Sequence, residues 1–244
     1  MSSAILVTQL NSVGKLVSSI LNNPKDNRIL SALPEKEYEH LVNLLEPVDL
    51  SLDEILLKAR QKCEYLYFPT QGIVSLISIM DGNSTTEIGL IGKEGMVGTL
   101  QFLGDGVSNS QTVVQGKGTA MRIESKVLRV EFERSKILQK LLLGYALKLF
   151  NQVSQGAACN NHHTVKQRTA RWLLMLDDRS DDTLTMTQQL LSKMLGVRRT
   201  GVSEVANEIK QQGIIDYQRG KITILDRQAL EVIACECYQL IKDA

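Results

Sequence analysis

Between residue 48 and about residue 124, hydrophobic and polar positions alternate in short runs, which is the pattern of half-buried β-strands. The runs are YLYF, GIVSLISIM, TTEIGLIG, QTVVQG and TAMRI. Turn residues separate them, and Asp81-Gly82-Asn83 is the clearest hairpin signal. Ten of the 17 glycines lie between Gly72 and Gly118, and no connection leaves room for a crossover helix. The segment therefore predicts an antiparallel β-roll of the barrel or jelly-roll kind.

The residues before the roll show a weaker pattern. We expect an N-terminal extension over 1–31 that is loose or partly helical. A helix is predicted to begin at Pro34 and to continue until Pro47, because apolar residues recur there at helical spacing.

From Ser135 the chain reads KILQKLLLGYALKLFNQVSQGAA, which contains no proline and keeps a helical period. One apolar stripe recurs at alternating steps of four and three residues: Leu142, Ala146, Leu149 and Val153. Such heptad-like spacing on a long helix is typical of self-association, so we predict that this stripe forms a dimer interface. The alternative is a helix that packs against the roll alone. The width of the apolar face favours the dimer.

The last third of the chain contains further helical patterns around a predicted β-hairpin. VKQRTARWLLMLDD is amphipathic, and GIIDYQRGKITILD predicts two strands that turn at Arg219-Gly220. DRQALEVIACECYQLIKD predicts one closing helix capped by Asp226.

Between them, TMTQQLLSKMLGVRRTGVSEV predicts two short helices joined by a sharp turn. Thr187 is a good N-cap for the first helix, and Gly196 permits the left-handed backbone conformation that ends it. The inward-facing residues of the two helices are expected to be Leu190, Leu191, Met194, Val202, Val205 and Ile209. This is the geometry of a helix-turn-helix, whose second helix enters the DNA major groove.

The polar residues of this region suit DNA. Arginine pairs with guanine, glutamate accepts from the cytosine amino group, and hydroxyl groups contact bases or phosphates. A helix N-terminus can hold a phosphate, and the hairpin tip would form a wing on the DNA backbone. From 186 to 221 there are six Lys or Arg residues and three acids, a local charge of +3. The predicted DNA contacts are Thr187, Gln188, Gln189, Arg198, Arg199, Thr200, Ser203, Glu204, Arg219 and Lys221.

Composition adds limits. The 244 residues are 43% hydrophobic and 23% charged, which excludes wholesale disorder, and the net charge of +1 neither requires nor forbids a polyanionic partner. No apolar run is long enough for a membrane span, and the N-terminus lacks the pattern of a signal peptide. Four scattered cysteines do not form a disulfide framework, so we expect a protein of the reducing cytoplasm.

The order of β-roll, long helix and winged helix-turn-helix resembles the Crp/Fnr family of bacterial transcription regulators, from about residue 32 to the C-terminus. VKQRTARWLL, TQQLLSKMLGVRRTGVSEV and GIIDYQRGKITILD carry the resemblance. It implies an α+β fold with a cyclic-nucleotide-binding-like roll (32–124), a dimerisation helix region (125–157) and a DNA-binding domain (158–244). It also implies a homodimer on a near-palindromic operator, with RNA polymerase as a further candidate partner. Thr200 stands where many relatives have a recognition glutamate, so the operator should differ from theirs.

The sensor half departs from that family. Members that bind cyclic AMP use a glutamate just after a glycine for the ribose and an arginine about ten residues later for the phosphate. Here Thr99 follows Gly98, and the arginine position falls near Asn109 and Ser110, so both charges are missing. A buried phosphate without a cation is unfavourable. We therefore predict that this pocket does not bind a cyclic nucleotide in the usual manner. An apo-active protein or a different small-molecule effector is expected.

Other chemistry is weaker. Cys159 with His162 or His163 offers two metal ligands on one helix, but we see no further ligands and predict no metal site and no cofactor. Cys235 and Cys237 would point to different sides of a helix. We expect Cys237 to lie in the core and Cys235 to have no particular role. No catalytic constellation is evident, so an enzyme is not expected. The alternative to a DNA-binding regulator is a ligand-binding module that acts through a partner protein and whose helix-turn-helix is only structural.

Overall fold

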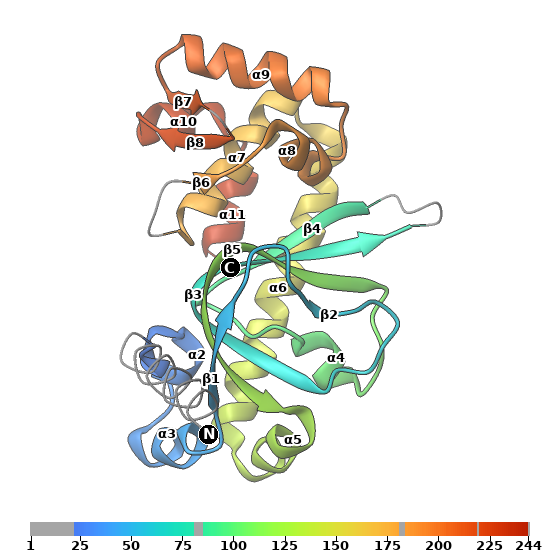
Figure 1. The fold of residues 1–244 in the computed structure, drawn as a ribbon, viewed down its shortest axis with the longest axis vertical. Helices are drawn as coiled ribbons and strands as arrows, with labels where there is room; N and C mark the ends of the chain where they lie inside the picture. Colours follow the sequence, from blue (N-terminus) through green and yellow to red (C-terminus); the bar gives the residue numbers. More distant parts are fainter. Residues whose placement is uncertain (1–21, 81–84, 181–183, 219, 244) are drawn as a thin grey trace, which may run out of the picture.

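The computed structural model describes residues 22–80, 85–180, 184–218 and 220–243. The signals at residues 1–21, at Asp81-Gly82-Asn83 and at Arg219 therefore lie outside the described residues. Figure 1 shows a roll in the lower half of the molecule, a long helix along it, and a helical domain above.

The part before the roll is helical in short pieces: η1 (Pro24–Asp26), α2 (Arg28–Ser31) and α3 (Glu35–Val42). Pro34 is the residue before α3, as the pattern predicts. The expectation that this helix continues to Pro47 is wrong, because β1 already begins at Glu46 and pairs with β5. The register of the sheet therefore overrides the helical spacing of the residues between Val42 and Glu46.

The roll is an antiparallel sheet with the strand order β1-β5-β3-β4, in which β2 also pairs with β5. Its strands are β1 (Glu46–Leu50), β2 (Ile55–Leu57), β3 (Tyr65–Ile79), β4 (Thr85–Ile91) and β5 (Ser110–Glu124), and α4 (Thr99–Gly104) lies between β4 and β5. The prediction of an antiparallel roll is confirmed, but the short runs merge into two long strands. YLYF and GIVSLISIM form β3, and QTVVQG and TAMRI form β5.

Two glycines let the long strands continue where β3 and β5 approach closely. A Cβ atom on Gly118 would lie 2.2 Å from the Gln71 carbonyl oxygen. One on Gly72, where φ is +92°, would lie 2.6 Å from the Gly116 carbonyl oxygen. The glycine-rich composition of the roll therefore reflects close backbone contact as well as turns.

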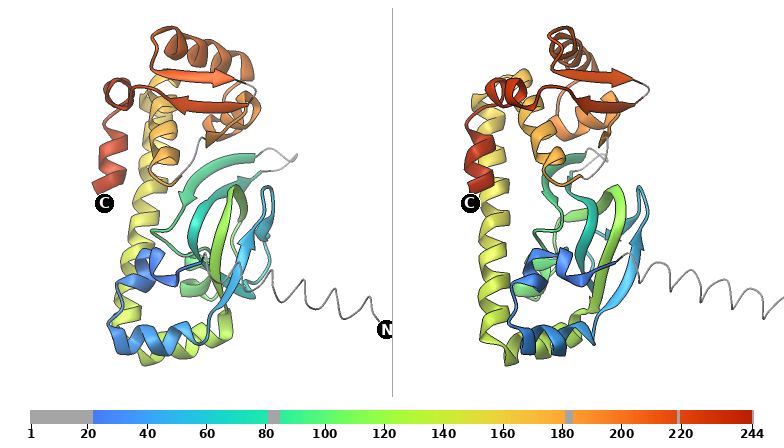
Figure 2. Two further views of the ribbon diagram at one scale, coloured as in Figure 1. Left: turned by 60° about the vertical axis from the view of Figure 1, so that its left-hand side comes forward. Right: turned by 90° about the vertical axis from the view of Figure 1, so that its left-hand side faces the viewer.

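After α5 (Ser125–Arg134), the helix α6 (Lys136–His162) runs unbroken for 27 residues along the roll. The Ser135 side chain accepts a hydrogen bond from the Leu138 N–H and caps the helix. Figure 2 shows α6 as the longest helix, reaching from the bottom of the roll to the upper domain. It crosses the domain boundary that we predicted between residues 157 and 158.

A buried glutamine attaches α6 to the roll. The Gln152 amide accepts from the Leu90 N–H at 2.7 Å and donates to the Leu90 carbonyl at 3.1 Å. The side chain thus makes the two bonds to β4 that a neighbouring strand would make. This contact fixes the position of α6 along the edge of the sheet.

The C-terminal part contains the predicted helices and hairpin. Its elements are α7 (Val165–Asp177), β6 (Leu184–Thr185), α8 (Gln188–Leu195), α9 (Arg199–Gln211), β7 (Ile215–Gln218), β8 (Lys221–Ile224), α10 (Arg227–Ile233) and α11 (Cys237–Asp243). The small sheet has the order β6-β8-β7. The side chain of Asp226 caps α10 by accepting from the Ala229 N–H at 2.9 Å, as predicted. The expectation of a single closing helix is wrong, because Ala234 is extended and separates α10 from α11.

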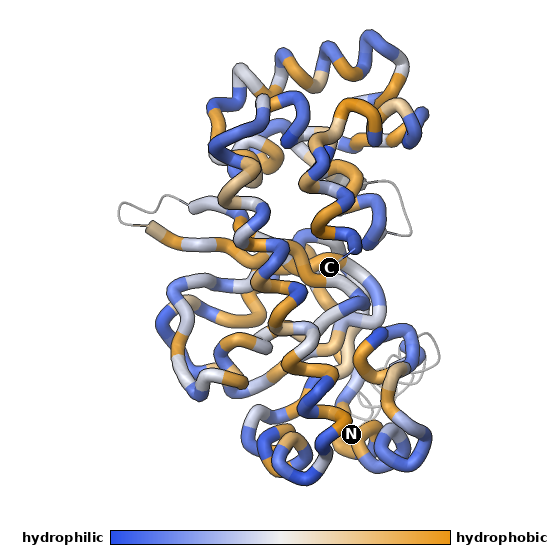
Figure 3. The backbone as a smooth tube through the Cα atoms, turned by 180° about the vertical axis from the view of Figure 1, so that it is seen from behind, coloured by the Kyte–Doolittle hydropathy of each residue, from blue (hydrophilic) through white to orange (hydrophobic). Residues whose placement is uncertain are grey.

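Two apolar cores stabilise the fold. One fills the roll and includes the inward face of α6, and the other fills the C-terminal part around α7. Ile73 and Leu90 of the roll belong to the second core, so the two parts share a packed boundary. In Figure 3, hydrophobic segments run along the strands of the roll, whereas hydrophilic and hydrophobic positions alternate along α9 at the top. Among the described residues, no helix combines the length and apolarity that a bilayer crossing needs.

Candidate functional site

The helices α8 and α9 form a helix-turn-helix held together by local bonds. The Thr187 hydroxyl accepts from the Leu190 N–H at 3.1 Å, and Gly196 ends α8 in the left-handed region with φ +63°. Both features agree with the sequence prediction. Leu191, Met194, Val202 and Ile209 are buried, and Leu190 and Val205 are half-buried, so the predicted inward face is largely correct.

The front of α9 is open to solvent. Arg198, Arg199, Thr200 and Glu204 are exposed, and Figure 1 shows α9 at the end of the molecule farthest from the roll. Neither arginine forms an ion pair with any residue that the structure describes. Two guanidinium groups without an acidic partner therefore stand side by side where a helix begins, and an anionic surface could approach them from outside.

Gln188 links the three parts of this surface. Its side-chain oxygen accepts a hydrogen bond from the Ser203 hydroxyl of α9 at 2.7 Å, and its N–H donates to the Tyr217 hydroxyl of β7 at 3.2 Å. Sequence reasoning placed Gln188 and Ser203 at the DNA but missed Tyr217, since only the fold brings β7 to the start of α8. The bonds fix the two helices and the hairpin relative to one another. Thr187 and Gln189 remain exposed beside them.

The predicted hairpin is formed by β7 and β8, which pair with Gln218 opposite Lys221. Lys221 is exposed, whereas Arg219 lies outside the described residues. Lys210 bonds Asp216 at 2.9 Å and the Tyr217 carbonyl at 3.1 Å, which attaches the end of α9 to the hairpin. The hydrogen bond from Lys210 holds the pKa of the Asp216 carboxyl below its ordinary value. Lys210 is thus engaged within the domain rather than facing a partner.

The predicted dimer stripe on α6 is largely inside the chain. Leu142 and Leu149 are buried in the core of the roll, and Ala146 and Val153 are half-buried. The prediction that this stripe is the interface is therefore wrong for Leu142 and Leu149, because the roll already covers them. A row shifted by one residue is exposed instead, with Leu143 at 56%, Leu147 at 60% and Phe150 at 63%. A one-residue shift rotates the row by about 100° around the helix.

The residues predicted to form the effector pocket have different surroundings. Thr99 is buried, and its hydroxyl donates to the Met96 carbonyl at 2.7 Å. Gly98 has φ +92°, and a Cβ there would lie 2.6 Å from the Leu66 side chain. Asn109 is exposed, and Ser110 begins β5 with a buried side chain. The Thr99 hydroxyl is thus already bonded to the backbone of Met96. That these four residues contact an effector stays a prediction.

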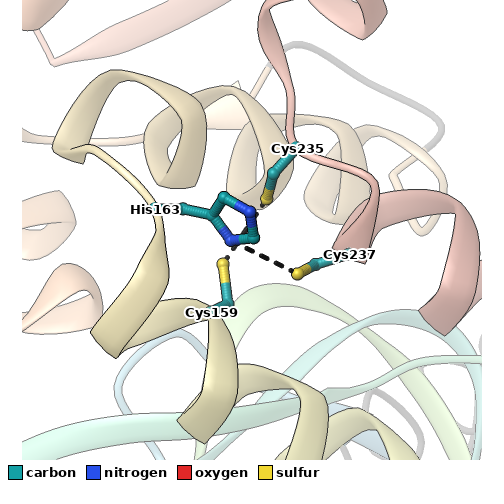
Figure 4. Close-up of side chains that lie close together, drawn as sticks. All are labelled: Cys159, His163, Cys235 and Cys237. Atoms are coloured by element: carbon teal, nitrogen blue, oxygen red, sulfur yellow. Dashed lines mark hydrogen bonds between the residues drawn. The ribbon is translucent and has the colours of Figure 1, made fainter.

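Four other side chains meet at the junction of the long helix and the C-terminal helices. The sulfur atoms of Cys159, Cys235 and Cys237 and a ring nitrogen of His163 all lie within 4.8 Å of one another. Figure 4 shows the four side chains pointing toward one centre. Cys159 lies in α6, His163 directly follows it, Cys235 lies between α10 and α11, and Cys237 begins α11. The expectation that Cys235 is incidental is wrong. Because the helix breaks at Ala234, Cys235 and Cys237 face the same side, and Cys235 is only 4% exposed.

The sequence matches two known domain families. Residues 47–135 match the cyclic nucleotide-binding domain, and residues 167–233 match the Crp-like helix-turn-helix domain. The sequence has no match among curated proteins.

Several solved structures have the same fold. FixK2 from Bradyrhizobium japonicum superposes with a TM-score of 0.67 at 16% identity, covering 78% of this chain and 98% of that one. A CRP/FNR-family transcriptional regulator from Thermus thermophilus gives 0.65 at 18% identity, with the same two coverages. A putative regulator of that family from Eubacterium rectale gives 0.66 at 15%, covering 84% and 96%. The likeness extends over nearly the whole length of each of these chains.

Proposed function

Because the chain belongs to the Crp/Fnr family of transcription regulators and carries its helix-turn-helix domain, we propose that it acts as a homodimer on a specific, near-palindromic operator. The observation that carries the proposal is the open front of α9, where Arg198 and Arg199 are exposed without an acidic partner among the described residues. A buried or ion-paired arginine would be unable to reach a base edge. These two are available for one.

The roles follow from chemistry and position. Arg199 and Glu204 lie on the exposed face of α9 and would contact base edges, with Arg199 bidentate to a guanine. Arg198, Thr200 and Ser203 would contact bases or phosphates beside them. Thr187, Gln188 and Gln189 at the start of α8 would hold a phosphate, and Lys221 with Arg219 would extend the contact from the wing. The bonds of Gln188 to α9 and β7 support this role, since they hold all three elements ready for one DNA face.

A dimer would use the exposed row of α6. Leu143, Leu147 and Phe150 follow one another at steps of four and three residues, which is the spacing of a coiled-coil seam. Solvent-exposed apolar rows on one helix are costly for a monomer and are typical of association surfaces. Pairing two copies along this row would present two α9 helices to the DNA. Recognition helices of such dimers bind half-sites about 34 Å apart.

The sensor is proposed to respond to something other than a cyclic nucleotide bound in the usual manner, or to be active without an effector. Thr99 and Asn109 supply neither of the two charges that the ribose and the phosphate need. A different small-molecule effector would act by binding one arrangement of the dimer more tightly than another. RNA polymerase is the further partner that such a regulator would meet at a promoter.

The test is binding to an operator selected from random duplexes, followed by fluorescence anisotropy over a range of salt concentrations. The wild-type protein should bind more weakly as salt rises, because phosphate contacts release counterions. Arg199→Ala should cost about 1–3 kcal/mol on the selected operator and relax the preference at one base pair. Arg28→Ala, an exposed arginine on the distant α2, is the matched control and should leave the affinity unchanged.

Two results would count against the proposal. If Arg199→Ala lost the same affinity on every duplex, Arg199 would be a phosphate contact and would not recognise a base. A protein that selects no duplex, or whose affinity for it ignores salt, would instead favour the partner-protein alternative, in which the helix-turn-helix is structural.

A further inference from the structure

We propose that Cys159, His163, Cys235 and Cys237 bind one Zn²⁺ ion as a closed, four-coordinate structural site. The site would join the end of α6 to Cys235, between α10 and α11, and to Cys237, the first residue of α11. This inference does not depend on DNA binding, and none of the four residues belongs to the proposed DNA surface.

The distances fit a tetrahedral ion. Zn–S bonds of about 2.3 Å and Zn–N bonds of about 2.0–2.1 Å place the ligand atoms roughly 3.5–3.8 Å apart. The Cys159 and Cys235 sulfurs are 3.5 Å apart, and the Cys237 sulfur is 3.5 Å from His163 Nδ1. All four atoms lie within 4.8 Å of one another, so small side-chain movements would complete the site. Simple packing of two thiols against each other would not explain why an imidazole and a third sulfur converge on the same point.

The backbone places these ligands before any ion binds. Cys159 and His163 lie four residues apart, and the His163 N–H still donates to the Cys159 carbonyl at 3.1 Å. On the other side, the extended Ala234 turns the chain so that Cys235 and Cys237 face the same centre. The three cysteines are buried and His163 is half-buried, which leaves no open position for a substrate. Structural zinc sites are closed in this way, whereas catalytic sites keep one position for water.

The surrounding residues orient the ligands. His163 turns Nδ1 toward the sulfurs, and its Nε2 lies 3.2 Å from the Glu236 carboxylate. A carboxylate on the outer nitrogen is the usual partner of a metal-binding histidine, because it fixes the tautomer and raises the basicity of the ligand nitrogen. The Gln155 amide donates to the Cys237 sulfur at 3.1 Å. A hydrogen bond of this kind stabilises a thiolate more than a neutral thiol.

Charge also supports an anionic centre. Three thiolates and a neutral imidazole around Zn²⁺ carry one net negative charge. The Arg171 guanidinium is 1% exposed, has no acidic ion-pair partner among the described residues and interacts electrostatically with Cys159. Arg168 is also buried and interacts with Cys159 and Cys235. A buried arginine is costly without an anion, and a zinc–thiolate centre would provide one.

The ligand set selects the metal. Soft thiolates with one imidazole in a tetrahedral arrangement favour zinc over the hard cations that prefer carboxylates. The expected consequence is mechanical. Binding would fix the last turn of α6 to the C-terminal helices, and the free energy of binding would add to the stability of the folded chain.

The experiment measures metal in the full chain, purified without chelator and after removal of any histidine tag. Elemental analysis should find about one zinc per chain. Cys159→Ser and Cys235→Ser should lose nearly all of it, whereas Cys63→Ser should keep it. Cys63 is the matched control, because its half-buried thiol lies in the roll and donates to the Tyr65 carbonyl instead.

Cobalt binding to the wild-type chain provides a second test that does not depend on whether a serine variant folds. Co²⁺ added to the metal-free wild-type chain should give the intense visible bands of a tetrahedral thiolate site. His163→Cys should retain binding with stronger sulfur-to-metal absorption, while His163→Ala should weaken it. A wild-type chain that contains less than about a tenth of an equivalent of zinc and gives no tetrahedral cobalt spectrum would overturn the proposal. So would a Cys159–Cys235 disulfide, found by mass spectrometry, in protein purified under reducing conditions.

Discussion

Leu147 and Leu149 of α6 allow the proposed dimer to be tested by the same substitution at two nearby positions. Leu147 is 60% exposed and lies in the row proposed to pair, whereas Leu149 is 3% exposed in the core of the roll. Leu147→Ala should weaken association and leave the folded chain intact. Leu149→Ala should destabilise the fold and leave association nearly unchanged.

The magnitudes follow from the exposed areas. A leucine-to-alanine change removes three carbons, worth about 2.4 kcal/mol at about 0.8 kcal/mol per methylene when burial is complete. A dimer that covers Leu147 newly buries about 60% of that side chain, so each protomer loses roughly 1.4 kcal/mol. The two-fold axis doubles the loss to about 3 kcal/mol, or roughly 100-fold in the dissociation constant. Leu149→Ala instead leaves a cavity and should cost about 2–5 kcal/mol of folding free energy.

Sedimentation equilibrium at several protein concentrations measures the dissociation constant of the folded dimer, and chemical denaturation measures stability. Leu225→Ala is the matched control, because Leu225 is also 60% exposed but lies outside α6. A Leu149→Ala protein that folds but dissociates more readily than Leu147→Ala would refute the reasoning and restore the inward stripe as the interface. Equal dissociation of all three variants and wild type would place the dimer elsewhere.

Two further predictions concern the roll. Calorimetry should detect no micromolar binding of cyclic AMP or cyclic GMP, since Thr99 and Asn109 lack the necessary charges, and such binding by either nucleotide would contradict that reading. Burial raises the pKa of the Glu87 carboxyl from 4.5 to about 8, against a hydrogen bond from Ser75 that lowers it. The folded state therefore holds the proton more tightly than the unfolded state, and stability should fall by up to about 1.4 kcal/mol per pH unit between pH 4.5 and about 8. Denaturation across this range should show a flatter profile for Glu87→Gln, and parallel profiles would disprove the assignment.

The helix-turn-helix could be predicted because its signals are local. The cap at Thr187, the left-handed glycine at Gly196 and the buried period of α9 each depend on residues within a few positions. The order of domains followed from the change in period along the chain. The length of β3 and β5 did not, because a bulged strand that bends at Gly72 looks like two strands separated by a turn.

The face of α6 could not be assigned from its sequence. The row that begins at Leu142 and the row that begins at Leu143 have the same spacing, and both are mostly apolar. Only the packing of α6 on the roll shows which row is covered. Periodicity predicts that a helix has an apolar face, but it does not predict what packs against that face.

The four-residue cluster was missed for a related reason. Cys159 and Cys235 are 76 positions apart, and their meeting depends on the packing of α11 against α6. In addition, we assumed one continuous closing helix, and on such a helix the side chains of Cys235 and Cys237 would point to different sides. A cysteine–histidine pair one turn apart and a second cysteine pair downstream were the signal available in the sequence.

Ile73 and Leu90 are strand residues of the roll that lie in the apolar core of the helix-turn-helix domain. The orientation of α9 therefore depends partly on apolar packing against these two residues of the roll, in addition to the covalent connection through α6. Any tilt between the two parts must break or rearrange this packing, at a free-energy cost set by the apolar area exposed. Thermodynamic reciprocity would then apply: if the roll binds a small molecule that changes the affinity for a duplex, a duplex that selects one tilt would change the affinity for that molecule by the same factor.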